Sequence, residues 1–368
     1  MDAHSLVVPE FWQSESSFQL EAACVTWVDG ITCPSLVFST SGSTGVPRRI
    51  VLSKKSLLIS AQAVNAHLCV DERSMWGLCL PWWHVGGLGV IARSYQAQAG
   101  LSVFSSRWNA GECLSWLKEN SVTHLSLVPT QVHDLISLGL RAPDTLQAIV
   151  VGGGRLENSL GQRARDLGWP VLSSYGMTEA GSQIATQNLA ALALPYAIEP
   201  LPILSCWEVR SGDGNRLEIR GDALFHGEME LEQGEWKYRA RVGDWYATQD
   251  CGVIGVNGLR LTHRADSLVK VLGELVNPTL IESALCDAGL PVGSFAVLAI
   301  PDPRKEHRLV LVHENLEAPL VSTALEVYHQ TCAGYARIDG IQVVTEFPRS
   351  DLGKILRERL RARVECSF

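Results

Sequence analysis

The sequence has a deficit of positive charge and no closely spaced cysteines. Its 368 residues contain 31 Lys and Arg against 39 Asp and Glu, a formal net charge of −8. Because no overall basic field exists, we expect no binding to nucleic acid or to an anionic membrane surface, and an anionic ligand must be bound by local groups. The 10 cysteines form no CxxC motif, which favours free thiols in a reducing cytoplasm over disulfides or a zinc site.

Long hydrophobic runs are also missing. The longest charge-free apolar stretch, residues 77–92, is interrupted by a proline, a histidine and several glycines, so it is too short and too broken to span a bilayer. Residues 1–15 carry acidic residues and lack a cationic start, so no secretory signal is predicted. These absences predict a cytoplasmic protein without stable membrane association.

The sequence does have a globular composition and an alternation of strand-like and helix-like segments. Apolar residues make up 46% of the chain and charged residues 19%, and the length predicts two or three domains. The alternation predicts an α/β fold with mixed α/β layers, in which helices cover a largely apolar sheet. The predicted strands are residues 35–40, 75–80, 101–104, 122–128 and 146–151, and the predicted helices are residues 54–68, 109–120, 131–139 and 157–167.

The pattern changes twice further along the chain. Residues 206–262 contain short alternating strands with glycine turns, which predicts a β-rich subdomain with strands at 207–210, 216–220 and 235–238. Beyond residue 266 a small α+β domain is predicted, with helices at 278–288 and 321–331 and strands at 295–300, 308–313 and 340–347. We therefore expect an N-terminal domain over residues 1–265 and a C-terminal domain over residues 266–368.

A row of hydroxyls and glycines directly follows the first predicted strand. The row consists of Ser39, Thr40, Ser41, Gly42, Ser43, Thr44 and Gly45. Backbone N–H groups and small hydroxyls in such a loop can surround phosphate oxygens, and glycine allows their close approach. The Gly-Lys-Ser/Thr ending of a Walker A loop is missing, and such a segment taken alone is more often a solvated turn.

A second segment combines an aromatic ring, hydroxyls and a carboxylate. Its residues are Ser174, Tyr175, Gly176, Met177, Thr178 and Glu179. Tyr175 could stack on adenine, Thr178 could contact a phosphate and Glu179 could hold Mg²⁺. Taken alone, the segment is more typical of an ordinary turn at the end of a strand.

Three charged residues complete the set of candidates. Asp250 and Arg264 could bond to ribose hydroxyls, although an exposed loop aspartate is usually a turn residue. Lys354 stands in a Gly-Lys step that is predicted to open a helix with Leu360 and Val364 on its apolar side. A mobile ammonium group on a small domain is suited to neutralise a carboxylate and a phosphate as they meet. The alternative is one more cation on a basic helix.

These elements in this order resemble the adenylate-forming superfamily, which includes acyl-CoA synthetases, peptide-synthetase adenylation domains and luciferases. The resemblance covers about residues 35–360. It implies that Thr40 to Gly45 form the phosphate loop, that Ser174 to Thr178 bind the nucleotide and that Glu179 binds Mg²⁺. It also implies Asp250 and Arg264 as the ribose pair, Asp266 as the hinge of a mobile C-terminal domain, Lys354 as the catalytic lysine and Gly273 beside the thiol of CoA.

Within the superfamily, residues 81–88, 123–131 and 151–154 resemble the o-succinylbenzoate:CoA ligases of menaquinone synthesis. This resemblance implies ATP, Mg²⁺ and CoA as cofactor and cosubstrates, and a small-molecule carboxylic acid that is joined first to AMP and then to CoA. The candidates for the acyl site are His84, Trp83, Thr130, Gln131 and Gly152, with Gly153 and Gly154 on the nucleotide side. A histidine beside a tryptophan is, however, at least as often a packing residue. Arg155 is a candidate for binding the second carboxylate.

Several positions depart from the pattern of the superfamily. Arg48 replaces the usual lysine after the loop proline, and Gln249 and His263 replace glycines that commonly precede the ribose-binding pair. These changes alter local backbone freedom but remove no charge that the chemistry needs. Since only about 38 residues precede the phosphate loop, we expect the N-terminal subdomain of larger relatives to be reduced or absent.

Other functions stay open at this point. The chain could be a ligase for another aryl or fatty acid, or a stand-alone adenylation enzyme that loads a carrier protein. A nucleotide-binding pseudoenzyme is a further alternative, although Glu179, Asp250 and Lys354 occur together. Residues 87–92 loosely match the dinucleotide fingerprint of an oxidoreductase. The sequence allows an oligomer but does not predict one.

Overall fold

The computed structural model of the chain describes residues 2–21, 24–28, 31, 33–40, 48–350 and 353–365. The chain forms two compact units. The N-terminal unit consists of Met1–Gly212, Leu217–Thr248 and Val253–Arg260, and the C-terminal unit of Asp213–Arg216, Gln249–Gly252 and Leu261–Phe368. No helix within the described ranges is long and apolar enough to cross a membrane. The boundary between residues 265 and 266 stays a prediction.

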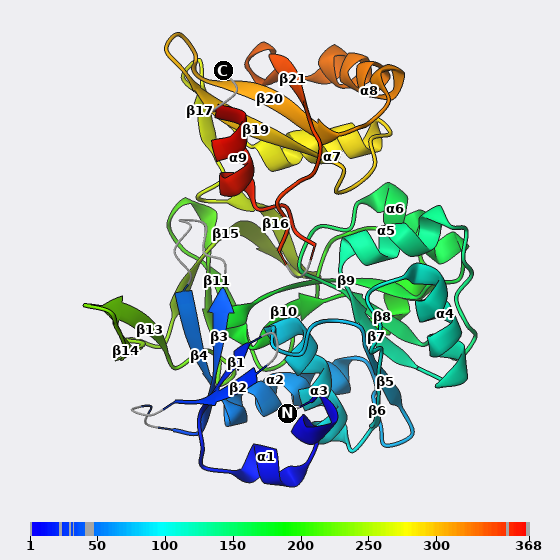
Figure 1. Cartoon of the computed structure of the whole chain (residues 1–368), viewed down its shortest axis with the longest axis vertical. Helices are drawn as coiled ribbons and strands as arrows, with labels where there is room; N and C mark the ends of the chain where they lie inside the picture. The colour runs from blue at the N-terminus through cyan, green and yellow to red at the C-terminus, as the bar shows by residue number, and fades with distance from the viewer. Residues whose placement is uncertain are drawn as a thin grey trace. The chain divides into compact units, whose positions relative to one another are not determined.

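The N-terminal unit contains two six-stranded sheets (Figure 1). The first has the order β14-β13-β4-β3-β1-β2. Its strands are β1 (Phe18–Glu21), β2 (Cys24–Trp27), β3 (Ser35–Thr40), β4 (Arg48–Ser53), β13 (Gly227–Glu232) and β14 (Glu235–Ala240). The second has the order β10-β9-β8-β7-β5-β6. Its strands are β5 (Met75–Leu78), β6 (Gly100–Val103), β7 (His124–Leu127), β8 (Ala148–Val151), β9 (Val171–Met177) and β10 (Ser182–Thr186).

The direction of the strands in the second sheet determines where its loops gather. Strands β5 to β9 all run parallel, and β10 alone is antiparallel to its neighbour β9. The segments that follow β5, β7, β8 and β9 therefore leave the sheet at one common edge. Ligands of open α/β sheets bind outside this carboxyl edge.

Helices cover both faces of this sheet (Figure 1). Between the two sheets lie α2 (Lys54–His67), which contacts β4 and β10, and α3 (Val85–Ala97), which contacts α2, β5 and β7. The other face carries α4 (Ala110–Glu119), α5 (Pro129–Ser137) and α6 (Asn158–Asp166). Helix α2 begins at the N-cap Ser53, whose Oγ accepts a hydrogen bond of 2.9 Å from the backbone N–H of Ser56.

The predicted strands and helices between residues 35 and 167 are all present, with ends that differ by a few residues. Helix α3 is missed by the sequence analysis because Gly86, Gly87 and Gly89 lower its helix propensity. Packing overrides that cost, since a Cβ atom on Gly87 would lie 2.2 Å from the carbonyl oxygen of Pro81. Residues 87–92 lie wholly inside α3, so they do not form the strand-to-helix turn that binds a dinucleotide.

The N-terminal segment is attached to α2 by one buried lysine. The segment includes α1 (Pro9–Gln13) and β1, neither of which is predicted from the sequence. Lys54 is only 2% exposed. Its Nζ donates to the carbonyl oxygens of Phe11 at 2.8 Å and Ser14 at 2.9 Å, and to Ser14 Oγ at 2.8 Å. The same ammonium group lies over the rings of Phe11 and Phe18.

The predicted β-rich region divides between two sheets. Strands β11 (Glu208–Ser211), β12 (Arg216–Arg220), β15 (Tyr246–Gly255) and β16 (Gly258–Arg264) form a four-stranded sheet in the order β11-β12-β15-β16. The hairpin of β13 and β14 instead extends the first sheet, because β13 pairs antiparallel with β4. This pairing brings residues from the middle of the chain beside the start of β4.

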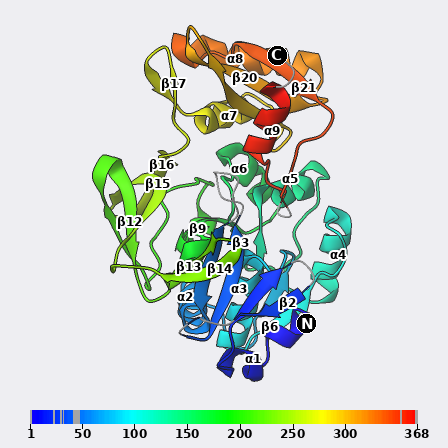
Figure 2. The same cartoon turned by 60° about the vertical axis from the view of Figure 1, so that its left-hand side comes forward.

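The C-terminal unit has the predicted α+β composition (Figure 2). Strands β19 (Phe295–Asp302), β20 (Glu306–Glu314) and β21 (Gly340–Val344) form a three-stranded sheet, and β17 (Val269–Val271) pairs with β18 (Glu274–Val276). Alternate side chains of β19 and β20 belong to two separate apolar clusters. One cluster includes α7 (Pro278–Asp287) and α8 (Ala318–Thr331), and the other includes Leu360 and Val364 of α9 (Arg357–Glu365).

The prediction that Gly353 and Lys354 open a helix is wrong. Helix α9 begins at Arg357, and Lys354 precedes it in a loop closed by an isolated bridge between Arg349 and Ile355. Gly353 has φ +74°, a left-handed conformation that cannot continue a right-handed helix. Lys354 is therefore carried on a turn and not on a helix.

The buried ammonium group of Lys54 leads to a prediction on stability. Lys54→Ala removes the donor for three oxygen acceptors, so we expect the free energy of unfolding to fall by about 2–4 kcal/mol. The matched control Lys55→Ala removes an exposed neighbour and should change it by less than about 0.5 kcal/mol. Urea denaturation at pH 7 measures both, and equal values for the two variants would contradict the assigned role.

The same lysine should affect how stability depends on pH. Burial lowers the pKa of Lys54 from 10.5 to about 8. Between these two values the unfolded chain binds more protons than the folded one, so this group makes the protein more stable as pH rises through the window. Urea midpoints measured from pH 7.5 to 10.5 should therefore rise more steeply, or fall less steeply, in the wild type than in Lys54→Ala. Parallel curves would contradict the lowered pKa.

Candidate functional site

The ends of the predicted phosphate loop are held by two paired strands. Thr40 is the last residue of β3 and pairs with Arg48, the first residue of β4. Thr40 Oγ1 donates to the carbonyl oxygen of Arg48 at 3.2 Å. The predicted loop residues Ser41, Gly42, Ser43, Thr44 and Gly45 lie outside the described residues, so their proposed contacts with phosphate remain predictions.

The segment predicted to bind the nucleotide base is mostly strand. Ser174 to Met177 belong to β9, and a short 3₁₀ turn, Thr178–Ala180, leads to β10. Tyr175 is buried, and Ser174 Oγ lies 2.9 Å from Thr186 Oγ1. A Cβ atom on Gly176 would lie 1.6 Å from the carbonyl oxygen of Ser182, so only glycine allows the two strands to approach this closely. The hairpin thereby fixes the position of Glu179.

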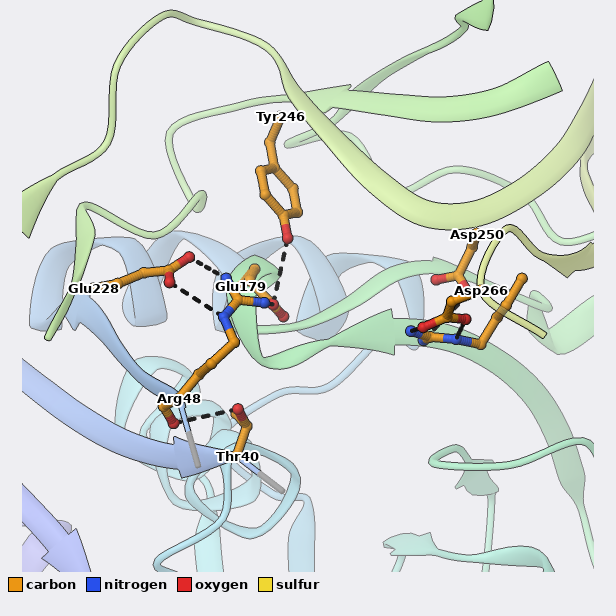
Figure 3. A network of polar contacts seen from close by, with 8 residues as sticks. Thr40, Arg48, Glu179, Glu228, Tyr246, Asp250 and Asp266 are labelled. Carbon is orange, nitrogen blue, oxygen red and sulfur yellow. Dashed lines mark hydrogen bonds and ion pairs between the residues drawn. The ribbon is translucent and has the colours of Figure 1, made fainter. Parts of the chain in front are cut away.

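Glu179 is the centre of a charged cluster in the N-terminal unit (Figure 3). Its carbonyl oxygen accepts a hydrogen bond of 2.8 Å from the backbone N–H of Phe225, and its Oε1 accepts one of 3.4 Å from the hydroxyl of Tyr246. Arg48 Nη1 lies 3.6 Å from the same Oε1. Arg48 also bonds to both carboxylate oxygens of Glu228, from Nε at 3.2 Å and from Nη2. Burial, followed by the charge of Glu179, raises the pKa of Tyr246 to about 12.

The donor set at Glu179 is compatible with a magnesium ion that is shared with a phosphate. The described residues contain no group of three or more His, Cys, Asp or Glu side chains that could hold a metal ion by themselves. Mg²⁺ usually keeps several waters and takes one or two carboxylates together with substrate phosphates. Glu179 is such a carboxylate, and it lies next to the strand end that leads out of the predicted phosphate loop.

In the C-terminal unit the predicted ribose pair and the predicted hinge residue lie together (Figure 3). Arg264 Nη1 is 3.6 Å from Asp250 Oδ1. Its Nε and Nη2 each donate to the carboxylate of Asp266 at 3.0 Å. The backbone N–H of Ala265 donates to the carbonyl oxygen of Gln249 at 2.7 Å. Arg264 therefore contacts two carboxylates, and its orientation depends on the residue predicted to be the hinge.

The loop that carries Lys354 is anchored at its base. Arg349 Nη2 donates to Glu314 Oε2 at 2.6 Å and to the carbonyl oxygen of Gly293 at 2.7 Å. Within the loop the backbone N–H of Lys354 donates to Ser350 Oγ at 3.3 Å. The Lys354 side chain is exposed. Desolvation by surrounding protein lowers the pKa of Lys354, the charge of Arg264 lowers it further, and Asp250 raises it. The ammonium group therefore shares the electrostatic environment of the ribose pair.

Gly273 lies at the tip of the hairpin between β17 and β18. It has φ +83° and follows Leu272, which has φ +54°. Its backbone N–H donates to Glu306 Oε2 at 2.8 Å. A Cβ atom at this position would meet nothing within 4 Å. The hairpin tip therefore gives the open backbone position that a passing thiol would need.

The residues predicted for the acyl site all follow parallel strands of the second sheet. His84 is the N-cap of α3 after β5, Thr130 and Gln131 lie in the first turn of α5 after β7, and Gly152 to Gly154 follow β8. The structure thus gathers them at one edge of the sheet. Gln131, however, has its side chain engaged with the backbone: Oε1 accepts from Val128 N at 3.1 Å and Nε2 donates to Cys79 O at 3.4 Å.

The sequence analysis missed a buried arginine beside this edge. Arg93 of α3 is 2% exposed, and its donors reach Ser126 Oγ at 3.1 Å and Ser182 Oγ at 3.2 Å. No carboxylate of the described residues forms an ion pair with it, and burial lowers the pKa of Arg93 to about 9. Arg155, the earlier candidate, instead pairs with Glu157 at 3.4 Å. A single arginine directly after a charge-free apolar stretch is the sequence signal that could have identified Arg93.

The chain is similar to known enzymes in sequence and in fold. Residues 30–210 match the family of AMP-binding enzymes, so this part of the chain is similar to that family. Its curated relatives include 2-succinylbenzoate–CoA ligases. The one from Bacillus licheniformis is 27% identical over 361 residues, which are 92% of this chain and 73% of the relative. The one from Escherichia coli is 29% identical over 298 residues, which are 80% of this chain and 61% of the relative.

Solved structures of related enzymes share the fold of this chain. A variant of Escherichia coli MenE with bound OSB-AMS has a TM-score of 0.74 and 25% identity, and the match covers 94% of this chain and 73% of that one. The Bacillus subtilis o-succinylbenzoate CoA synthetase (MenE) in complex with the acyl-adenylate intermediate OSB-AMP has a TM-score of 0.74 and 22% identity, over 89% and 68% of the two chains. These likenesses confirm the predicted adenylate-forming fold.

The close approach at Gly176 leads to a prediction on the stability of the β9–β10 hairpin. Gly176→Ala places a methyl group against the backbone of Ser182, so β9 and β10 must separate, and we expect the free energy of unfolding to fall by about 3 kcal/mol or more. Gly152→Ala is the matched control, since a Cβ atom there meets nothing within 4 Å, and it should cost less than about 1 kcal/mol. Urea denaturation of both variants tests this, and a stable Gly176→Ala protein would show that the hairpin does not fix Glu179.

Proposed function

We propose that the chain is an ATP-dependent acid:CoA ligase that converts o-succinylbenzoate to its CoA thioester in menaquinone synthesis. The reaction has two steps: formation of an acyl-adenylate with release of pyrophosphate, then transfer of the acyl group to CoA with release of AMP. The names of the relatives support this substrate. The observation that carries the proposal is the buried guanidinium of Arg93, which lacks an ion-pair partner among the described carboxylates.

The first step is limited by repulsion between two anions. A substrate carboxylate must approach the α-phosphate of ATP, and more negative charge develops on the phosphoryl oxygens as the bond forms. Mg²⁺ bound through Glu179 would neutralise part of the phosphate charge. We assign the loop residues Thr40 to Gly45 to the phosphates, Ser174 to Thr178 with Gly153 and Gly154 to the nucleotide, and Asp250 with Arg264 to the ribose.

Lys354 supplies the charge that the first step needs most. Its ammonium group would lie between the carboxylate and the α-phosphate, where each such donor contributes on the order of 3–4 kcal/mol to the transition state. Its place on a turn anchored by Arg349 and Glu314 supports this role, because the charge is carried on a fixed base. The protein needs no covalent nucleophile in this mechanism.

In the second step, the thiol of CoA must reach the acyl-adenylate while Lys354 is withdrawn. We propose that the C-terminal domain rotates about Asp266 and that Gly273 then faces the thiol. The bidentate bond of Asp266 to Arg264 supports a coupling between the hinge and the ribose pair. The scattered cysteines and the absence of long apolar runs in the sequence support a cytoplasmic location.

The acyl pocket is assigned to the edge where the loops after β5, β7 and β8 meet. His84, Thr130 and Gly152 would contact the substrate, whereas the backbone bonds of Gln131 favour a role in holding the wall of the pocket. Arg93 would bind the second carboxylate of the substrate, because an ion pair would compensate a buried guanidinium whose contacts among the described residues are two hydroxyls and the ring of Trp76. Ser182, one of those hydroxyls, pairs in the sheet with Met177 of the nucleotide segment.

Lys354→Ala separates the two half-reactions. We expect formation of the acyl-adenylate, measured as pyrophosphate exchange into ATP, to fall by about 10²–10³-fold because the transition state loses its mobile cation. Thioester formation from supplied acyl-adenylate and CoA should change by only a few-fold. Equal losses in both half-reactions would contradict the division of labour, and wild-type protein without any pyrophosphate exchange would indicate a nucleotide-binding pseudoenzyme.

Arg93→Met tests the substrate class. The variant leaves the second carboxylate of bound o-succinylbenzoate unpaired, so kcat/KM for this acid should fall by about 10²-fold. Benzoate lacks a second carboxylate, so its kcat/KM should change by only a few-fold. The ratio of the two values within one variant does not depend on the folded fraction of the preparation. The control Arg155→Met should leave the ratio unchanged. Equal losses for both acids, or a wild-type preference for a monoacid, would point to another aryl or fatty acid ligase.

A carrier-loading enzyme is the remaining alternative. It would form the same acyl-adenylate and differ only in the acceptor thiol. Replacing CoA by a phosphopantetheinylated carrier protein in the thioester assay distinguishes the two enzymes. Faster transfer to the carrier protein than to CoA would show that the carrier is the acceptor.

A further inference from the structure

The ion pair between Arg48 and Glu228 joins two distant parts of the chain at Glu179. Glu228 lies on β13 and Arg48 begins β4, the neighbouring antiparallel strand. Long side chains on diagonal positions of such a pair can reach one another. The backbone N–H of Phe225, just before β13, donates to the carbonyl oxygen of Glu179 at 2.8 Å. The start of β13 and Glu179 are therefore joined through the backbone, independently of the side chains.

The guanidinium of Arg48 is turned away from Glu179 by Glu228. Its Nε and Nη2, which form one edge of the planar group, both bond to the carboxylate of Glu228. Only Nη1 is directed to Glu179, at 3.6 Å from Oε1, which is longer than a hydrogen bond. A guanidinium beside a single carboxylate would instead form the stronger bidentate pair with it. Glu228 thus occupies the edge of Arg48 that would otherwise cover Glu179.

The charges in this cluster favour a cation at Glu179. One positive charge on Arg48 stands against two negative charges on Glu179 and Glu228, so the cluster has a net charge of −1. Without Glu228 the sum is zero, and the remaining pair is self-neutralised. Tyr246 donates to Oε1 of Glu179, the same oxygen that faces Arg48. The known contacts therefore gather on one oxygen of the Glu179 carboxylate.

We propose that Glu228 is a positioning residue for the metal–nucleotide end of the site. It holds Arg48 edge-on, and so keeps the Glu179 carboxylate available to the divalent ion of ATP. This role rests on the proposed function and adds Glu228 of β13 to the residues of the metal–nucleotide site. It predicts that Glu228 acts through Arg48 and not through direct contact with the metal.

Binding of Mn²⁺, used in place of Mg²⁺, tests this without any turnover. Free Mn²⁺ is measured by electron paramagnetic resonance with the full chain and a non-hydrolysable α,β-methylene analogue of ATP. We expect Glu228→Gln to raise the Kd for Mn²⁺ by roughly tenfold, because the released guanidinium of Arg48 turns to pair with Glu179 and competes with the ion. Glu230→Gln, on the same strand and paired with Arg239, should bind Mn²⁺ like the wild type.

Rescue by a second substitution distinguishes positioning from a structural role. In an Arg48→Met background, Glu228→Gln should cause less than a twofold change, because the guanidinium that it restrains is gone. Glu228→Asp retains the charge on a shorter side chain and should give an intermediate Kd, which covers the case in which Glu228→Gln folds poorly.

The possible outcomes are distinct. Equal Mn²⁺ affinity in the wild type and Glu228→Gln, or the same loss in both Arg48 backgrounds, overturns the role of Glu228 and leaves the proposed function standing. A wild-type chain that binds no Mn²⁺ together with the nucleotide analogue overturns the proposed function and, with it, this inference.

Discussion

Repulsion between anions is the constraint on which the rest of the structure depends. The chain has a net charge of −8, so it cannot attract a carboxylate and a triphosphate through its overall field, and few cations must act at close range. The structure accordingly places single positive groups at separate points: Arg48 beside Glu179, Arg93 under the carboxyl edge of the second sheet, and Lys354 on a turn of the C-terminal unit. The guanidinium groups of Arg48 and Arg93 each have hydrogen-bond acceptors that fix their direction.

The sheet explains how residues from distant segments reach one place. Because β5 to β9 are parallel, every segment that follows one of these strands starts at the same edge. The short turn Thr178–Ala180 then leads back into β10, and the close approach of Gly176 to Ser182 holds the two strands together. Glu179, in this turn, lies beside Arg48 of the first sheet. Short loops on rigid strands therefore suffice to bring together the residues assigned to the acyl group, the nucleotide and the metal in the proposed function.

Much of the fold and part of the site could be predicted from the sequence. Apolar strands and amphipathic helices are local patterns, so the α/β order and the α+β unit follow from them, and the family resemblance adds Glu179, Asp250, Arg264 and Lys354. Helix α3 could not be predicted, since its three glycines disfavour a helix and the close packing of Gly87 against Pro81 exists only in the folded structure. Arg93 was missed with the helix. The pairing of Arg48 with Glu228 joins residues 180 positions apart, which no spacing rule reveals.

Glu228 accounts for the departure from the family pattern at Arg48. Where a lysine follows the loop proline, its ammonium group is a point charge that can share a carboxylate with a metal ion. An arginine at the same position presents two parallel donors that match one carboxylate, and it would compete with the ion for Glu179. The carboxylate of Glu228 on the neighbouring strand removes that competition, because it accepts hydrogen bonds from both Nε and Nη2 of Arg48. In the proposed site, an arginine at residue 48 is compatible with metal binding because β13 pairs with β4 and carries Glu228 within reach.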